Sequence, residues 1–271
     1  MTTSVQLSII IVNYNGLKYL SSCIGSIVKH IKTNYEIIIV DNASTDNSVQ
    51  FLKENYQNDI IIIESKINLG FSKGNNLGAS HAKGNTILLL NNDTILLTDL
   101  DKAIKKLNQK QIGAIGIKML GKVNEYRLSA GYFPSPLRLL KLKSLYKTNQ
   151  GFYKGVFLQE FYDVDWIEAS FLLIKKEVWN SIKGFDEDYF MYVEDIDLCK
   201  RILNNNYKVI YMTSLAYIHY GGYGESREQL LKEGLIKYAK KHFNYLARPL
   251  ALLSITLNFK VKKIKRFSIK L

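Results

Sequence analysis

The sequence predicts an α/β fold with a mostly parallel central sheet flanked by helices. Four short runs rich in Ile, Val and Leu recur in the first hundred residues, at Leu7–Asn13, Glu36–Asp41, Ile60–Glu64 and Thr86–Leu90. Continuous apolar runs of this kind suit strands that are buried on both faces. Turns rich in Asn, Asp or Gly and segments of helical period lie between the runs, and such helices supply the crossovers that parallel strands require.

The remaining elements follow from the same periodicities. A fifth apolar run, Ile112–Ile117, extends the sheet, whereas residues of about 119–163 lose the periodicity and predict an irregular basic insertion. Regular patterns then return as an apolar run Val164–Ile174, a helix near Lys175–Ile182, a helix Glu194–Leu203, a strand Tyr207–Met212 and a charged amphipathic helix Ser226–Tyr245. We expect one α/β domain over residues 1–225 and a basic helical extension over residues 226–271.

Charge is distributed unevenly along the chain. The 37 Lys and Arg and 24 Asp and Glu give a net charge of +13, but residues 1–101 carry −2, 102–154 carry +11, 155–228 carry −6 and 229–271 carry +10. The polar motifs lie in the two segments of net negative charge, residues 1–101 and 155–228, which argues against a nucleic acid as partner. The last basic stretch follows an apolar run and favours contact with an anionic membrane surface, although a solvated tail also accounts for it.

Cysteine usage and hydropathy predict the compartment. Cys23 and Cys199 lie far apart and form neither a metal-binding nor a disulfide pattern. No window holds the about 20 apolar residues that a membrane-spanning helix needs, and the first residues lack the basic region of a secretory signal. We expect a cytoplasmic protein that binds peripherally to the inner face of the cell membrane.

Polar residues gather where three of the predicted strands end. Asn13–Gly16, Asp41–Asp46 and Asn91–Thr94 follow apolar runs, and in open α/β sheets ligands bind beyond the carboxyl ends of the strands. Neither GxGxxG nor GxxxxGK[ST] occurs after the first strand. A diphosphate bound at this rim therefore needs another counter-charge, most simply a divalent cation held by a carboxylate, and Asp93 is placed for that role.

Six segments resemble, in the same order, the family-two inverting glycosyltransferases of GT-A fold, and especially their rhamnosyltransferase-like branch. They are Ser8–Asn15 (SIIIVNYN), Val40–Ser48 (VDNASTDNS), Asn68–Gly78 (NLGFSKGNNLG), Leu90–Asp93 (LNND), Gly184–Leu198 (GFDEDYFMYVEDIDL) and His219–Gly222 (HYGG). The resemblance implies a GT-A nucleotide-diphospho-sugar transferase fold and a metal-dependent inverting reaction. The sugar, with rhamnose as a candidate, would pass from a dTDP- or UDP-sugar to a saccharide acceptor, expected to be lipid-linked, in cell-surface polysaccharide biosynthesis.

The resemblance also assigns residues to the nucleotide. It implies that Asp41 accepts the ring N–H of uracil or thymine, which a carboxylate can do. Tyr14 is expected near the base or ribose, and Asn76 and Asn92 are expected to line the sugar-nucleotide cleft. Each of three positions has a structural alternative: a cap at the turn for Asp41, a core aromatic for Tyr14 and a loop-to-helix turn for Asn76.

Metal binding is implied by the Leu90–Asp93 segment, which stands where the family has its DxD-type motif. Because the first two motif positions are Asn, only Asp93 brings a full charge. One carboxylate with water and phosphate oxygens can still hold Mn²⁺ or Mg²⁺. His219 corresponds to a second metal ligand in the family, although a histidine at a strand end can equally be a core residue.

The reacting groups are implied by the later segments. Asp195 corresponds to the general base that deprotonates the acceptor, and Glu194 is the second candidate for this role. Acidic residues also suit the first turn of a helix, which is the structural alternative for both. Trp166 and Glu168 match a segment that forms the bottom of the acceptor site in the family. Ala169 stands in this segment where the family usually has glycine. A tryptophan in a strand can also be a core residue.

Two other functions fit parts of the sequence. A nucleotidyltransferase could share the sheet and would release pyrophosphate, but no Gly-rich basic loop for a triphosphate follows the first strand. A non-enzymatic membrane-surface module could use the basic blocks, and it would bind anionic vesicles without affinity for a nucleoside diphosphate.

Overall fold

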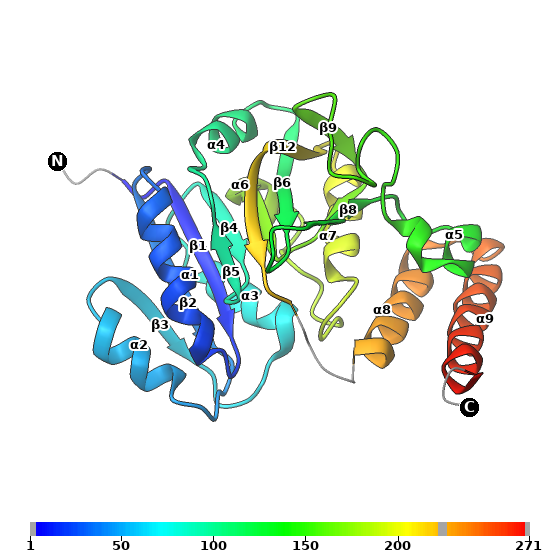
Figure 1. The fold of residues 1–271 in the computed structure, drawn as a ribbon, viewed down its shortest axis with the longest axis horizontal. Coiled ribbons are helices and arrows are strands. Elements are labelled where there is room, and N and C mark those ends of the chain that lie inside the picture. Colours follow the sequence, from blue (N-terminus) through cyan, green and yellow to red (C-terminus); the bar gives the residue numbers. More distant parts are fainter. Residues whose placement is uncertain (1–3, 222–226, 269–271) are drawn as a thin grey trace.

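The first half of the sheet forms as the apolar runs predict. The computed structural model describes residues 4–221 and 227–268 (Figure 1). Four parallel strands run in the order β3-β2-β1-β4. They are β1 (Leu7–Asn13), β2 (Tyr35–Asp41), β3 (Ile60–Glu64) and β4 (Thr86–Leu90). The crossovers contain α1 (Leu17–His30), α2 (Ser48–Tyr56) and α3 (Gly70–Ser80).

The second half of the sheet is mixed. β11 (Phe171–Lys175) lies antiparallel between β4 and β6 (Ile112–Leu120), so the fifth predicted run does not pair with β4 directly. β6 pairs in parallel with β12 (Lys208–His219), and β5 (Thr94–Leu96) closes that edge antiparallel to β12. β11 can occupy the centre because four of its five side chains are buried.

Each face of the sheet packs on its own hydrophobic cluster. Ile10 and Leu89 face one cluster, whereas Ile9 and Leu88 face the other, as the two-residue period of a strand requires. The first cluster includes residues of α3 and α7 (Glu194–Asn204), and the second includes residues of α1, α2 and α4 (Asp101–Leu107). Burial on both faces explains why the sequence shows continuous rather than alternating apolar runs.

The segment 119–163 is more ordered than its sequence pattern predicts. It contains the end of β6, two short strands, two helical turns and β9 (Phe161–Val164), which pairs with β12. The other elements are β7 (Tyr126–Arg127), β8 (Ala130–Gly131), α5 (Pro136–Leu140) and the 3-10 helix η1 (Leu142–Leu145). Elements this short carry no detectable periodicity, yet Leu139, Leu145 and Phe152 are buried in the core.

The chain ends in a helical hairpin beside the α/β unit. After β10 (Trp166–Ile167), which pairs with β8, come α6 (Lys176–Ser181) and α7, and then α8 (Arg227–His242) and α9 (Ala247–Ser268) (Figure 1). The amide of Asn258 on α9 donates to the Leu140 carbonyl of α5. None of the helices in the described part of the chain is long and apolar enough to cross a membrane. The predicted domain boundary at residues 225 and 226 lies outside the described residues.

Candidate active site

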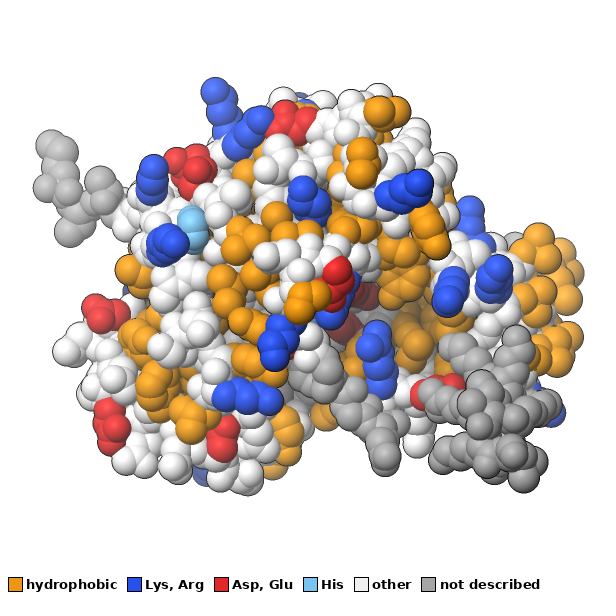
Figure 2. Space-filling model, in the orientation of Figure 1, with side chains coloured by type: hydrophobic (Ala, Val, Ile, Leu, Met, Phe, Trp, Pro, Cys, Tyr) orange, Lys and Arg blue, Asp and Glu red, His pale blue; other side chains and the backbone are white. Residues whose placement is uncertain are grey.

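A cleft of about 490 Å³ opens where β1, β4 and β12 end. Figure 2 shows it as a hollow with acidic side chains recessed inside and basic side chains beside them. Seven of the ten predicted site residues line it, namely Tyr14, Asn92, Trp166, Glu168, Glu194, Asp195 and His219. The topology therefore brings residues of each predicted role to one place, at the sheet edge where α/β folds bind ligands. Asp93 is not among the lining residues, and it is connected to the cleft through its contact with His219.

Asp93 and His219 form a buried pair at this rim. Asp93 lies between β4 and β5, and the antiparallel pairing of β5 with β12 sets Thr94 opposite His219. The His219 Nε2 atom lies 3.2 Å from Asp93 Oδ1, and the Gly221 N–H donates to Asp93 Oδ2 at 3.0 Å. Burial lowers the pKa of His219, but the bond to Asp93 and the charges of Asp93 and Glu168 raise it above its usual value.

The Asp93–His219 pair fits a divalent cation. A carboxylate oxygen and an imidazole nitrogen are donors that Mn²⁺ accepts, and their 3.2 Å separation suits neighbouring ligands of an octahedral ion, which lie about 3 Å apart at metal–ligand distances near about 2.1 Å. Within the described residues no group of three or more His, Cys, Asp and Glu side chains is arranged for a metal. The pair therefore suits an ion whose other ligands are phosphate oxygens and water.

The two asparagines of the DxD-type segment shape the rim. The Asn92 amide donates to Asn13 Oδ1 at 2.7 Å, and the Asn91 amide lies 3.4 Å from His219 Nε2. Asn92 lines the cleft and also connects the end of β4 to β1, while its role toward the nucleotide stays a prediction.

The carboxylates at the start of α7 have shifted pKa values. Burial, together with the charge of Glu168, raises the pKa of Asp195 to about 7. Burial and the charge of Asp195 raise the pKa of Glu194 well above its usual value. Burial also raises the pKa of Glu168. With a pKa near 7, Asp195 can gain and lose a proton near neutral pH, which is the property of a general base.

The predicted aromatic residues both reach the cleft. Tyr14 is 50% exposed, so it is not a core residue and its ring is available to a ligand. Trp166 is buried and its indole N–H donates to the Tyr132 carbonyl at 3.1 Å, while one side of it lines the cleft. Trp166 is thus a core side chain that also forms part of the cleft wall, and its role toward the acceptor stays a prediction.

Asp41 and Asn76 are engaged in local hydrogen bonds. Asp41 is 2% exposed, and its carboxylate accepts from the Asn13 amide and from the hydroxyl and N–H of Ser44. Asn76 donates to the Phe185 carbonyl and accepts from the Phe185 N–H, so it ties α3 to the loop before α7. Neither is among the residues that line the cleft, and their roles toward the nucleotide stay predictions.

Two arginines that were not predicted as site residues, Arg127 and Arg227, line the cleft. Arg127 is held by Glu125 at 2.7 Å, and Arg227 lies 5.6 Å from the centre of the Tyr192 ring. Nothing in the sequence distinguishes them from the other 35 basic residues, because only the fold brings β7 and the start of α8 to the cleft. Arg201, by contrast, binds Asp197 and two backbone carbonyls and is a structural residue.

Comparison with known proteins identifies the family. The family model described as glycosyl transferase family 2 matches residues 8–164. The chain belongs to this family. It is 28% identical over 207 residues to glycosyltransferase GlyG of Streptococcus pneumoniae serotype 4, covering 70% of this chain and 64% of GlyG. It is 35% identical over 85 residues to rhamnosyltransferase WbbL of Escherichia coli K12, which covers 31% of each protein. The matches thus span less than two thirds of these relatives.

Solved structures confirm the GT-A fold of this family-2 chain. S. aureus TarS 1-349 in complex with UDP-GlcNAc superposes with a TM-score of 0.64 at 17% identity, covering 98% of this chain and 76% of TarS. GalNAc-T7 with UDP, GalNAc and Mn²⁺ superposes with a TM-score of 0.67 at 12% identity, covering 90% of this chain and 52% of that protein. The predicted α/β fold with a mostly parallel sheet is therefore confirmed.

Proposed function

We propose that this chain is a metal-dependent inverting glycosyltransferase that moves a hexose, rhamnose being the leading candidate, from a dTDP- or UDP-sugar to a saccharide. The observation that carries the proposal is that Asp195, a carboxylate of raised pKa, lines the same cleft as His219, whose imidazole pairs with the buried Asp93. Asp195 takes the proton of an acceptor hydroxyl while that oxygen bonds to the anomeric carbon. The bond from this carbon to the diphosphate breaks on the opposite face, so the configuration inverts.

The remaining cleft residues divide between the two substrates. Tyr14, Asp41, Asn76 and Asn92 are assigned to the nucleotide half of the donor. Asp93 and His219 would hold Mn²⁺ or Mg²⁺, which neutralises negative charge on the departing diphosphate when bound. The name of WbbL and the ligands of the TarS and GalNAc-T7 structures support a nucleotide-sugar donor.

Trp166 and Glu168 are assigned to the acceptor. Both line the cleft with Asp195, and the Glu168 carboxylate contributes to the raised pKa of that residue. The acceptor would thus meet an apolar wall that carries a few acidic side chains. This arrangement is typical of pockets in which a small number of polar groups orient the ligand.

A thermal-shift screen with UDP- and dTDP-sugars tests this proposal. Stabilisation by one of these donors in the presence of Mn²⁺, followed by release of the nucleoside diphosphate when acceptor is added, would support it. Release of pyrophosphate from a nucleoside triphosphate would favour a nucleotidyltransferase instead. Binding to anionic vesicles with no affinity for any nucleoside diphosphate would favour a non-enzymatic module.

The rate should depend on pH through Asp195. Because the base must be deprotonated, kcat at saturating Mn²⁺ should fall about tenfold per pH unit below about pH 7 and level off above it. A pH profile of kcat with saturating donor and acceptor measures this. A flat profile between about pH 5 and 8 would contradict the assignment of a base with a pKa near 7.

We also propose that the acceptor is lipid-linked and that the protein acts on the inner face of the cell membrane. α9 and the residue before it expose an apolar stripe opposite the face that packs on the core. The stripe consists of Leu246, Leu250, Leu253, Leu257 and Val261, which are 43–67% exposed. Hydrophobic side chains cover the edge of the molecule over α5 and α9 (Figures 1 and 2). α9 contains no acidic residue, so a bilayer with anionic lipids complements it, whereas a second α9 would repel it.

Charge placed on this stripe should weaken vesicle binding. Replacing Leu253 and Leu257 by Glu removes apolar surface and adds negative charge, so binding to vesicles containing phosphatidylglycerol should weaken at least about tenfold. Co-sedimentation measures the bound fraction. Val28→Glu on α1, a similarly exposed apolar position on another helix, is the matched control and should bind as the wild type does. Equal binding of all three proteins would refute the membrane-facing role of α9.

A further inference from the structure

The residues directly before Glu194 adopt a backbone conformation that L-residues rarely take. Tyr192 has φ of 72° and Val193 has φ of 75°, two consecutive positions in the left-handed region. For a β-branched residue such as Val193 this conformation is an outlier, because the side chain crowds the backbone. The turn determines the direction in which Glu194 and Asp195 enter α7. Strain of this kind persists only where the surrounding structure holds it in place.

α8 packs directly on this strained turn. Gly234 lies so close that a Cβ atom added there would be 2.6 Å from the Tyr192 carbonyl oxygen and 2.9 Å from Val193 Cγ2. Contacts this short are not available to any residue with a side chain, so glycine is required at position 234 even though it weakens a helix. The close approach lets the α8 backbone support the turn without an intervening side chain.

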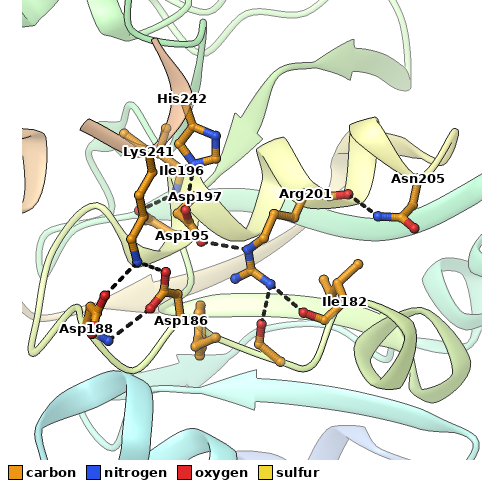
Figure 3. Close-up of polar contacts among 12 residues, drawn as sticks. Ile182, Asp186, Asp188, Asp195, Ile196, Asp197, Arg201, Asn205, Lys241 and His242 are labelled. Atoms are coloured by element: carbon orange, nitrogen blue, oxygen red, sulfur yellow. Dashed lines mark hydrogen bonds and ion pairs between the residues drawn. The ribbon is translucent and has the colours of Figure 1, made fainter. Parts of the chain in front are cut away.

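Polar contacts hold α8 to the loop before the turn (Figure 3). The Lys241 ammonium pairs with Asp186 and with Asp188, in the latter case at 2.9 Å. The Lys237 ammonium donates to the Asp188 carbonyl. These contacts fix the loop a few residues before the strained turn at Tyr192 and Val193.

A further contact holds α8 to α7 itself. His242 Nε2 lies 2.7 Å from Asp197 Oδ1, and Asp197 also accepts from Arg201 at 2.7 Å (Figure 3). At its other end α8 begins with Arg227, which lines the cleft. α8 therefore contacts the chain before, at and after the turn that presents Asp195.

We infer that α8 is a positioning element of the active site, which holds the strained turn at Tyr192 and Val193 so that Asp195 faces the acceptor. The inference rests on the proposed function, with Asp195 as base. It assigns α8 to the catalytic unit rather than to a separate extension that begins near residue 226. Neither Gly234 nor Lys241 lines the cleft, so each acts through the turn or the loop before it.

Gly234→Ala tests the inference most directly. Alanine favours the helix itself, but its methyl group displaces the turn. We expect kcat to fall at least about tenfold, KM for the donor to change less than about threefold, and amide hydrogen exchange of residues 190–196 to become at least about tenfold faster. Gly25→Ala on α1 is the matched control, because a Cβ there meets no atom within 4 Å, and it should leave all three quantities at wild-type values.

Lys241→Met tests the polar contacts in a variant that keeps the glycine. It should lower kcat about threefold or more without raising KM for the donor. Lys240→Met, a substitution of the exposed neighbouring residue, is the control and should leave kcat unchanged. Wild-type kcat and exchange in Gly234→Ala would overturn the inference, and so would faster exchange spread evenly over the whole chain. If the wild type transfers no sugar, the proposed function fails. Faster amide hydrogen exchange confined to residues 190–196 in Gly234→Ala would even then support the inference that α8 stabilises the turn.

Discussion

Asp195→Asn is expected to lower kcat by about 10²–10⁴-fold, the usual contribution of a general base. Asparagine keeps the shape of the side chain but cannot take the acceptor proton. Donor affinity should change little, because Asp195 is assigned to the acceptor side of the reaction. Single-turnover measurements with saturating donor separate the chemical step from binding and should show the whole loss in that step.

Glu194→Gln is the matched comparison for this prediction. Because burial and the charge of Asp195 raise the pKa of Glu194 and so favour its neutral form, a neutral amide is a close substitute, and kcat should fall less than about tenfold. A larger loss in Glu194→Gln than in Asp195→Asn would reverse the assignment of the two residues. Wild-type activity in both variants would contradict a carboxylate base at this site.

The stability of Asp195→Asn provides a second check. The pKa of Asp195 lies above its usual value of 3.8, so between about pH 4 and 7 the folded chain binds more protons at this residue than the unfolded chain does. The contribution of Asp195 to stability therefore falls as pH rises through that window. Asp195→Asn should remove this dependence, and at about pH 8 it should unfold at a temperature equal to or above that of the wild type.

Asp93→Asn is expected to abolish the dependence of activity on Mn²⁺ and to lower kcat/KM at least about 10³-fold. Asp93 supplies the full negative charge of the Asp93–His219 pair, and charge neutralisation at a leaving diphosphate contributes several kcal/mol to the rate. Asparagine keeps an oxygen that can accept from the Gly221 N–H, so the local fold should remain. Isothermal titration of Mn²⁺ in the presence of a nucleoside diphosphate measures the loss of metal affinity directly.

Asp46→Asn is the matched control for Asp93→Asn. Asp46 also lies at this end of the sheet, but its carboxylate accepts from the N–H groups of Leu17 and Ser48, whereas that of Asp93 pairs with His219. Its substitution should leave Mn²⁺ affinity and kcat unchanged. Equal Mn²⁺ affinity in the wild type and in Asp93→Asn would refute the metal site.

Much of the candidate site could be predicted because it depends on where strands end. Asn92 and Asp93 follow an apolar run, and parallel topology brings such positions to one rim. His219 lies beyond the predicted strand Tyr207–Met212, and only the family resemblance pointed to it, because β12 is longer than its apolar pattern predicts. Two adjacent carboxylates that are partly buried predict a raised pKa for one of them, as is found for Glu194 and Asp195. The contribution of Glu168 could not be predicted, because this residue reaches the same cleft from another part of the chain.

Two predicted nucleotide-binding residues, Asp41 and Asn76, do not line the cleft. Asp41 and Asn76 lie at the predicted strand end and helix, but local hydrogen bonds to Asn13, Ser44 and Phe185 occupy them. A sequence shows that an amide or carboxylate is present, but it does not show which neighbouring groups compete for its hydrogen bonds.

The four parallel strands of the first half of the sheet and the polar rim beyond them can be predicted from the amino-acid sequence. Those features follow from local patterns, namely apolar runs of strand length and the residues that end them. The folded chain was needed to show that β11 lies between β4 and β6, that Arg127 and Arg227 reach the cleft, and that α8 packs on the turn before Glu194. These features depend on contacts between residues far apart in the chain, and such contacts leave no periodic signal in the sequence.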